Sequence, residues 1–413
     1  MSGPATGFLF SLERFGMKFG LANMATLCET LGHPERAFPS IHVAGTNGKG
    51  SVAAMVDTAL GAAGWRTGRY TSPHLTRLEE RFVIDGREVT PEVLERAAAR
   101  VRTVVERLVA SGGLETWPTF FECTTAVAFD LFREARVDAA VIEAGLGGRL
   151  DATNVLSPMA TAIVSIDFDH QAQLGETLAA IAFEKAGIIK AGVPIVAGAL
   201  PAEAMAVIAR TAVERGAPLT CAGDDLALAA EVASLPLALA GAHQRANAAV
   251  ALRLLEVVDA DARHPIRVGA AARRAGLTTA SWPGRLEALA WRGRAILLDA
   301  AHNPAGAAAL ASYLATVAPE GVTLVFGAMQ DKAIDAMLGA LAPRVRRLIG
   351  TTAPTPRAAR ADVLVAAARR AGLDAEAVDD PMAALARALD AADPVVVAGS
   401  IFLIGAIRGQ LAP

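Results

Sequence analysis

One glycine-rich stretch constrains this chain more than any other: Gly45-Thr46-Asn47-Gly48-Lys49-Gly50-Ser51. The apolar run 41–44 before it predicts a buried strand, and the apolar spacing over 52–60 predicts a helix after it. A strand, a glycine-rich turn and a helix make a phosphate cradle, because glycines let the backbone approach closely and the helix N-terminus adds positive potential. We therefore expect Lys49 to meet the terminal phosphates of a nucleotide and Ser51 to reach a bound magnesium ion.

The spacing of this stretch differs from that of the common phosphate loop. That loop has four residues between its glycines and a Ser or Thr directly after its Lys. Here only Thr46 and Asn47 separate Gly45 from Gly48, and Gly50 follows Lys49. An alternative therefore stays open, in which the glycines serve only the geometry of a strand–turn–helix connection.

Composition narrows the classes of protein that the chain can represent. A length of 413 residues favours two domains, and 53% hydrophobic residues can fill large cores. The net charge of −3 gives no reason to expect nucleic acid or an anionic membrane as a partner. The apolar stretch 394–407 is too short to span a bilayer, and residues 1–10 lack the pattern of a signal peptide. Three distant cysteines indicate neither a disulfide framework nor a zinc site, so we expect a cytoplasmic protein.

Alternating strand and helix patterns predict an α/β protein with two mostly parallel sheets. We place the boundary in Ser281-Trp282-Pro283-Gly284, which gives an ATP-binding domain over 1–282 and a smaller Rossmann-like α/β domain over 283–413. The predicted strands are 41–44, 66–70, 82–84, 137–143, 160–166, 193–197, 294–299, 321–327, 345–349 and 394–398. The predicted helices are those within 8–34 and at 52–60, 91–111, 121–135, 177–187, 201–215, 243–258, 264–276, 304–317, 331–342, 360–371, 382–391 and 401–410.

Three polar side chains could contribute to a ligand site, and two of them lie at the ends of predicted strands. Glu143 ends a predicted strand, and its oxygen donors suit magnesium, although a salt-bridged structural Glu is the alternative. His170 follows the next strand, where a His with a structural role is the more common case. Lys185 lies in a mostly apolar helix; pairing with Glu184 or a charge at the helix end is its simpler explanation.

The longest motif connects these residues. The loop GTNGKGS and the stretch from His170 through Leu174-Gly175-Glu176-Thr177 to Ile181-Ala182-Phe183-Glu184-Lys185-Ala186-Gly187-Ile188 resemble the folylpolyglutamate synthase/dihydrofolate synthase family of the Mur-ligase superfamily. The resemblance implies a Mur-ligase-like P-loop ATPase domain. It also implies that Lys185 is carbamylated, which a buried amine of lowered pKa permits, and that it supports a metal site with Glu143 and His170. The family's Ser-Pro-His serine, a further metal ligand, falls on Ser72, whose alternative role is to cap a turn.

Further motifs of the family recur in order along roughly residues 14–410. By resemblance, Asn247 in the His-Gln-x-x-Asn pattern contacts ATP near the adenine, and Arg285 in Pro-Gly-Arg reaches the phosphates. Asp299 and His302 in D-x-A-H-N-P lie near the ribose and face the site, and Lys332 belongs to an Asp-Lys pair that we assign to substrate. On local sequence alone, Asn247 is a polar residue in an alanine-rich helix and Arg285 could tie down the linker.

The resemblance also indicates where a pterin-containing acceptor binds. The corresponding segments include 118–122 and 151–153, and acceptor preference also depends on residues near 16–19 and 72–82. Aromatic Phe121 can pack on a flat ring, although a core role for this Phe is equally compatible with its helix. The residues that we assign to substrate contacts in these segments are Met17, Phe19, Thr119, Phe121, Asp151 and Ala152.

The resemblance implies an ATP-dependent amide ligase with Lys49, Lys185 and His302 as catalytic residues. It would join L-glutamate to 7,8-dihydropteroate or to reduced folates through an acyl phosphate, using ATP and two Mg²⁺ sites, and acting as a monomer. A cell-wall Mur ligase is the nearest alternative, but Gly45 leaves no room before it for the additional domain of those enzymes. A nucleotide-binding protein without ligase activity is the alternative from another class.

Overall fold

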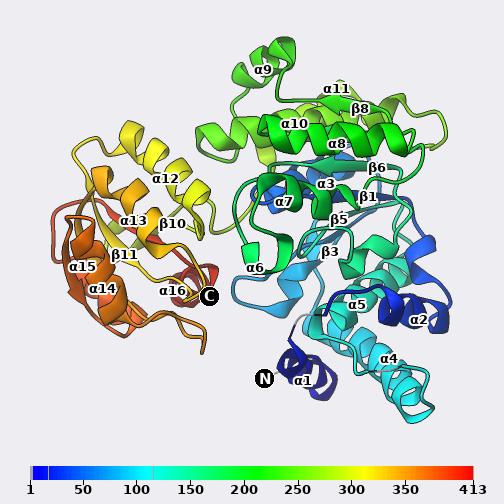
Figure 1. The fold of residues 1–413 in the computed structure, drawn as a ribbon, viewed down its shortest axis with the longest axis horizontal. Helices are drawn as coiled ribbons and strands as arrows, with labels where there is room; N and C mark the ends of the chain where they lie inside the picture. Colours follow the sequence, from blue (N-terminus) through cyan, green and yellow to red (C-terminus); the bar gives the residue numbers. More distant parts are fainter. Residues whose placement is uncertain (1–2, 17, 115, 413) are drawn as a thin grey trace.

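The computed structural model describes residues 3–16, 18–114 and 116–412, and in them two sheets form two lobes (Figure 1). The first sheet has the strand order β4-β3-β2-β5-β1-β6-β7-β8. Its six strands from β2 to β8 in this order are parallel, whereas β3 and β4 run antiparallel at one edge. The strands are β1 (Ser40–Ala44), β2 (Thr67–Tyr70), β3 (Phe82–Ile84), β4 (Arg87–Glu88), β5 (Ala139–Glu143), β6 (Ala160–Ile163), β7 (Ile195–Ala197) and β8 (Leu219–Cys221).

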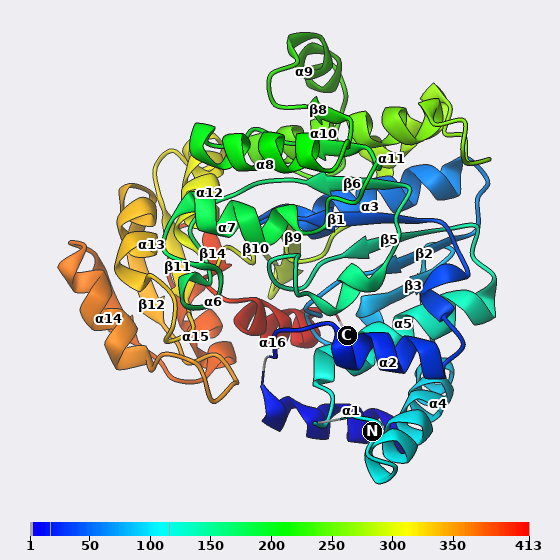
Figure 2. The ribbon, with the colours of Figure 1, turned by 45° about the vertical axis from the view of Figure 1, so that its right-hand side comes forward.

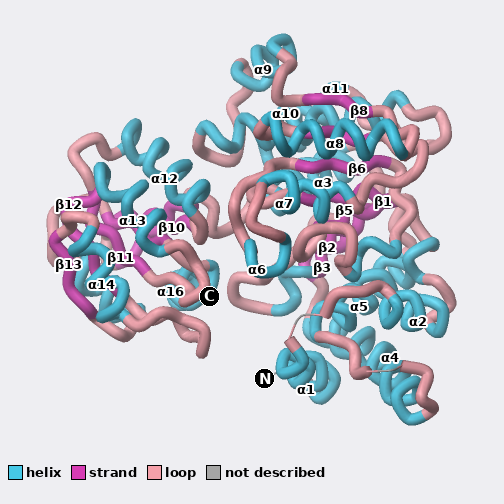
Figure 3. Tube along the Cα trace, in the orientation of Figure 1, coloured by secondary structure: helices cyan, strands magenta, loops and turns pink. Residues whose placement is uncertain are grey.

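Helices cover both faces of this sheet, because successive side chains of its central strands point to opposite sides. In β5, Val141 packs in the core with α3 and α10, while Ile142 packs in the core with α4 and α5. The same arrangement of helices on both sides of the strands is visible in Figure 3. The helices are α1 (Pro4–Ser11), α2 (Ala22–Thr30), α3 (Lys49–Ala62), α4 (Pro91–Ala110), α5 (Phe120–Ala135), α6 (Gln171–Leu174), α7 (Leu178–Ala186), α8 (Ala202–Glu214), α9 (Leu226–Ala233), α10 (Ala242–Ala260) and α11 (Ala270–Thr279).

The second lobe is built on a sheet of order β13-β12-β11-β14-β10-β9. Its strands are β9 (Glu287–Trp291), β10 (Arg294–Asp299), β11 (Val322–Phe326), β12 (Val345–Gly350), β13 (Asp374–Ala377) and β14 (Val395–Ala398). Here too the core is double: Val396 packs with α12–α14 and Val397 packs with α15 and α16. The helices are α12 (Pro304–Val317), α13 (Ile334–Leu341), α14 (Ala361–Arg370), α15 (Pro381–Ala388) and α16 (Ile401–Leu411).

The predicted pair of α/β sheets is confirmed, and the errors concern short or weakly patterned elements. The second sheet is not wholly parallel, because β9 pairs antiparallel with β10. The patterns also missed β8, β9, β13 and α9, and they placed α11 six residues too early. Gly187 follows α7 with an ordinary helical φ of −59°, and a Cβ there would lie 2.2 Å from Cα of Arg149. The domain boundary at 282/283 falls between α11 and β9 and stays a prediction.

The two lobes meet along the carboxyl edges of their parallel strands (Figure 2). One contact is made by the backbone of Leu75, after β2: a Cβ on Gly405 of α16 would lie only 1.9 Å from the Leu75 carbonyl oxygen. Because every βα loop of a parallel sheet leaves from the same edge, this arrangement brings the loops of both sheets together. None of the described helices is long and apolar enough to cross a membrane.

Candidate active site

The glycine-rich loop connects β1 to α3, as predicted, and its glycines have conformations that the loop requires. Gly48 precedes α3 with φ 84°, and a Cβ there would lie 2.3 Å from Oδ1 of Asn247, on α10. Gly50, in the first turn of α3, faces Trp282: a Cβ would lie 2.3 Å from its ring. The loop therefore passes close to α10 and to Trp282, and larger residues would displace it.

The backbone N–H groups of two loop residues already make hydrogen bonds within the protein. The backbone N–H of Thr46 donates to the Ser165 carbonyl (2.8 Å), and the backbone N–H of Asn47 donates to Ser165 Oγ (2.9 Å). The donors left for an anion are those of the first turn of α3, at Lys49, Gly50 and Ser51, which have no partner within the helix. The predicted phosphate contacts of Thr46 and Asn47 therefore cannot use these backbone donors, and stay predictions for their side chains.

Two lysines converge on one carbonyl of the loop. Nζ of Lys49 and Nζ of Lys185 each lie 3.0 Å from the Gly45 carbonyl oxygen, and Lys49 Nζ is 3.9 Å from Oε1 of Glu143. The suggested pair of Lys185 with Glu184 does not form, because Glu184 binds Arg149. Burial, reinforced by the charge of Lys49, lowers the pKa of Lys185 to about 7. A large part of this amine is thus uncharged near neutral pH, as capture of carbon dioxide requires.

Two side chains with oxygen atoms that could ligate a metal ion, Glu143 and Ser51, belong to the same region of the first lobe. Glu143 is buried at the end of β5, burial raises its pKa, and one of its oxygens accepts the Ser72 backbone N–H at 3.1 Å. Ser51 Oγ is buried and accepts a hydrogen bond from Gln244 Nε2 (3.2 Å). Among described residues, no group of three His, Cys, Asp or Glu side chains could hold a metal ion. The predicted ligands, by contrast, include serine hydroxyls and a modified lysine, and hard oxygen donors of this kind suit Mg²⁺.

A third cluster spans the lobes. Asp169, just before His170, accepts from Lys332 Nζ (2.6 Å) and Asn303 Nδ2 (3.0 Å), and its Oδ2 lies 3.5 Å from His302 Nε2. Burial alone would raise the pKa of Asp169, but the His302 contact and the charges of His170 and Lys332 hold it well below its usual value. Three predicted residues, His170, His302 and Lys332, thus gather around a carboxylate that no motif singled out.

Asp299 and Arg285 lie beside the lobe junction. Asp299 is buried, and its two oxygens accept the backbone N–H groups of Leu286 (2.9 Å) and Ala301 (3.0 Å). Burial raises the pKa of Asp299, and the charge of Arg285 opposes this shift. Arg285 also lowers the pKa of Glu143, so it acts electrostatically on the first lobe. The nucleotide contacts of both residues stay predictions.

Two of the residues predicted to contact the acceptor, Thr119 and Phe121, lie at the start of α5. Phe121 stacks on Tyr70 (6.1 Å between centroids), and a Cβ on Gly145 would lie 2.5 Å from its ring. Thr119 is the N-cap of α5, in a capping box with Glu122. Phe19 is 54% exposed, and Met17 lies outside the described residues.

Asp151 and Ala152 begin the short 3₁₀ turn Ala152–Val155, and both are buried. Asp151 caps this turn through the Thr153 backbone N–H (3.1 Å). The alternatives for Phe121, a ligand platform or a core residue, both remain compatible with its partly buried position against the core.

Comparison with known proteins decides the family. Residues 284–401 match the model of the Mur ligase, glutamate ligase domain. The chain is 35% identical to the dihydrofolate synthase/folylpolyglutamate synthase of Bacillus subtilis, covering 98% of each. The chain belongs to the dihydrofolate synthase/folylpolyglutamate synthase family. It spans half the length of the probable bifunctional folylpolyglutamate synthase/dihydropteroate synthase of Haloferax volcanii, at 36% identity over 98% of this chain.

Solved structures agree with this assignment. The folylpolyglutamate synthase of Mycobacterium tuberculosis, complexed with ADP and AMPPCP, superposes with a TM-score of 0.89 at 32% identity, over 99% of both chains. FolC of E. coli, solved with DHPP and ADP, superposes with a TM-score of 0.85 at 28% identity, over 99% of this chain and 98% of that chain. The predicted two-domain Mur-ligase fold class is thereby confirmed.

Three residues of the site, which hydrogen-bond to other site residues, were not identified from the amino-acid sequence. Asp169 directly precedes His170, and its strand-end position was the signal that could have identified it. Asn303 lay within D-x-A-H-N-P; its Nδ2 donates to Asn47 Oδ1 (3.0 Å) across the lobes. Gln244 is the glutamine of the His-Gln-x-x-Asn pattern, but its contact with Ser51 depends on how α10 packs against α3.

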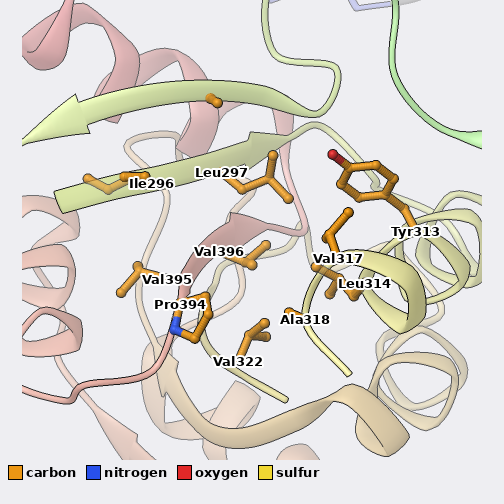
Figure 4. A pocket seen from close by; sticks show the side chains of 12 residues that line it. Ile296, Leu297, Tyr313, Leu314, Val317, Ala318, Val322, Pro394, Val395 and Val396 are labelled. Atoms are coloured by element: carbon orange, nitrogen blue, oxygen red, sulfur yellow. The ribbon is translucent and has the colours of Figure 1, made fainter. Parts of the chain in front are cut away.

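An apolar cavity of about 150 Å³ lies elsewhere in this family member, in the second lobe (Figure 4). Leu297, Tyr313, Val317 and Val396 are among the residues that line it, between the sheet and α12. Because this cavity has no charged lining residue, it offers nothing that would hold a nucleotide.

Proposed function

We propose that the chain is an ATP-dependent ligase that joins L-glutamate to 7,8-dihydropteroate, to the γ-carboxylate of reduced folates, or to both. The observation that carries this proposal is the convergence of Lys49 and Lys185 on the Gly45 carbonyl, 3.9 Å from Glu143 in the case of Lys49. The cation of Lys49 at a helix N-terminus, beside a Lys185 that can be carbamylated, suits the transfer of a phosphoryl group to a carboxylate. The relatives solved with nucleotide support ATP as the phosphoryl donor, and E. coli FolC solved with DHPP supports a pterin acceptor.

Each residue has a separate task in this proposal. Lys49 and the first-turn N–H groups of α3 bind and neutralise the terminal phosphates. Glu143, His170, Ser51, Ser72 and carbamylated Lys185 would hold Mg²⁺, which when bound neutralises phosphate charge. A Yersinia pestis relative solved with AMPPNP and a manganese ion supports a divalent cation here.

The second lobe completes the site. Arg285 and Asp299 would bind the phosphates and ribose of ATP, with Asn247 nearer the adenine, while His302 and Lys332 face the acyl phosphate and orient the incoming glutamate. Met17, Phe19, Thr119, Phe121, Asp151 and Ala152 would contact the acceptor. Contact between the lobes excludes water, which would otherwise hydrolyse the acyl phosphate. All these residues belong to one chain, so we infer that a monomer suffices for activity.

Turnover with defined substrates tests the proposal. Purified protein with ATP, Mg²⁺ and L-glutamate should release ADP only when dihydropteroate or tetrahydrofolate is also present, and a glutamyl conjugate should appear in equal amount. Running the two acceptors side by side shows which activities the enzyme has. ADP release without a conjugate, or no release with either acceptor, contradicts the proposal.

A further inference from the structure

His42 is a buried titratable residue that the proposed reaction does not use. It lies in the middle of β1, and its side chain is fully buried. Its Nε2 is 2.8 Å from Oγ1 of Thr153, whereas its Nδ1 has no hydrogen-bond partner. A buried imidazole with one satisfied nitrogen indicates a defined arrangement of protons.

The contact continues from Thr153 to Asp151. Oγ1 of Thr153, which is fully buried, lies 2.5 Å from Oδ1 of Asp151, and the Thr153 backbone N–H donates to the same oxygen at 3.1 Å. Oδ2 of Asp151 accepts the Leu146 backbone N–H at 2.8 Å. A line of hydrogen bonds thus runs from His42 in β1 to the loop that follows Glu143, the last residue of β5.

The single hydroxyl proton of Thr153 fixes the order of donors. If Thr153 donates to the Asp151 carboxylate, it must accept from Nε2–H of His42, and Nδ1 keeps only a lone pair. In the reverse order Asp151 is protonated, Thr153 donates to His42, and Nδ1 carries a proton. That proton would be a buried donor without an acceptor, which is unfavourable and rare.

Burial shifts the pKa of the group at each end of this line of hydrogen bonds. Burial lowers the pKa of His42 to about 3, so its ring carries one proton at neutral pH. Burial raises the pKa of Asp151, and the hydrogen bonds from Thr153 and from backbone N–H groups oppose this shift. These donors favour the ionised form and burial opposes it, so the order of protons rests on the unpaired Nδ1 of His42 and the single hydroxyl proton of Thr153.

We propose that His42 and Thr153 are positioning residues for Asp151: their ordered protons hold it as a carboxylate whose remaining lone pairs accept N–H donors of the acceptor substrate. The ligand class is a flat heterocycle with a ring N–H beside an exocyclic amino group, two donors that match two carboxylate oxygens. The inference rests on the proposed function for the identity of the acceptor.

Nitrogen NMR of the histidine-labelled enzyme tests the proton order without turnover. We expect His42 to show the Nε2–H tautomer at neutral pH, assigned by the loss of its signals in His42→Asn. The Nδ1–H tautomer would overturn the inference.

Equilibrium binding of dihydropteroate, measured by calorimetry, tests the effect on the substrate. Thr153→Val keeps the shape but removes the hydroxyl, and we expect its dissociation constant to rise about tenfold or more, because a hydrogen bond to a charged group is lost. Thr153→Ser keeps the hydroxyl and should bind nearly as the parent does, and all three proteins should bind ATP alike. Equal weakening of dihydropteroate binding in Thr153→Val and Thr153→Ser, or loss of ATP binding in Thr153→Val, indicates a merely structural role and refutes the inference. A parent enzyme that does not bind dihydropteroate refutes the proposed acceptor, and the tautomer still decides the proton order.

Discussion

Nζ of Lys332 lies 2.6 Å from Oδ1 of Asp169, and this ion pair joins loops that follow strands of two different sheets. Both side chains are largely buried, at 10% and 8% exposure. Asn303 adds a second bond to the same carboxylate. One carboxylate of the first lobe thus receives donors from the second lobe and adds to the other contacts between the lobes.

Removing the charge of Asp169 should loosen this junction. In Asp169→Asn, the buried ammonium of Lys332 loses its counter-charge, so we expect a stability loss of about 3 kcal/mol and a larger radius of gyration by small-angle scattering. Glu320→Gln is the matched control, because it removes an exposed ion pair with Arg346 that contributes little. Identical scattering and stability in the two variants would show that the pair does not hold the lobes.

Two glycines of α3 provide a matched pair for the nucleotide loop. In Gly50→Ala the new Cβ would lie 2.3 Å from the ring of Trp282, whereas at Gly61 nothing lies within 4 Å. We expect Gly50→Ala to lose about 1–3 kcal/mol of stability through overpacking and to bind ATP more weakly. Gly61→Ala should gain about 0.5–1 kcal/mol and bind ATP normally. Urea unfolding and ATP titration check both, and equal behaviour of the two variants contradicts the packing argument.

Lys49 should act on the transfer step. We expect Lys49→Met to lower kcat by about 10²–10³, because a cation next to the transferring phosphoryl group is removed. Binding of the acceptor should stay near that of the parent, since Lys49 begins α3 whereas Phe121 lies on α5. Steady-state turnover and acceptor binding separate these effects; a variant with normal kcat would exclude this role.

Carbamylation of Lys185 can be observed directly. Because the pKa of Lys185 is about 7, the reactive neutral amine becomes more abundant as the pH rises from 6 to 8. Gentle intact-protein mass spectrometry in bicarbonate should show one carbamate, with occupancy rising over this range. The signal should be absent from Lys185→Gln. An adduct that persists in that variant would belong to another amine.

His42 should also make stability depend on pH. Its pKa is about 3 in the folded protein and 6.5 as a model value, so between these values the unfolded chain binds one more proton. The free energy of unfolding contributed by this residue is therefore retained above pH 6.5. It falls by about 1.4 kcal/mol for each pH unit below that value, until pH 3. Urea unfolding from pH 7 to 5 should show a shallower decline in His42→Asn than in the parent; parallel curves would contradict the assignment.

Several residues could be identified from the amino-acid sequence because their signals are local. The strand before Gly45 and the helix after it follow from apolar spacing, and Glu143 is marked by its position at a strand end. The short strands β8 and β13 could not be predicted, since their few residues carry no clear alternation and are fixed by their neighbours in the sheet.

The sequence by itself determined the two α/β halves, the phosphate loop and the residue types needed for phosphate chemistry, because these depend on order and spacing along the chain. Only the tertiary structure decided that Lys49 and Lys185 share the Gly45 carbonyl, that Asp169 faces Lys332, and that His42 reaches Asp151 through Thr153. These contacts join residues as many as 163 positions apart. Their distances depend on how sheets and lobes pack, and no local pattern encodes that packing.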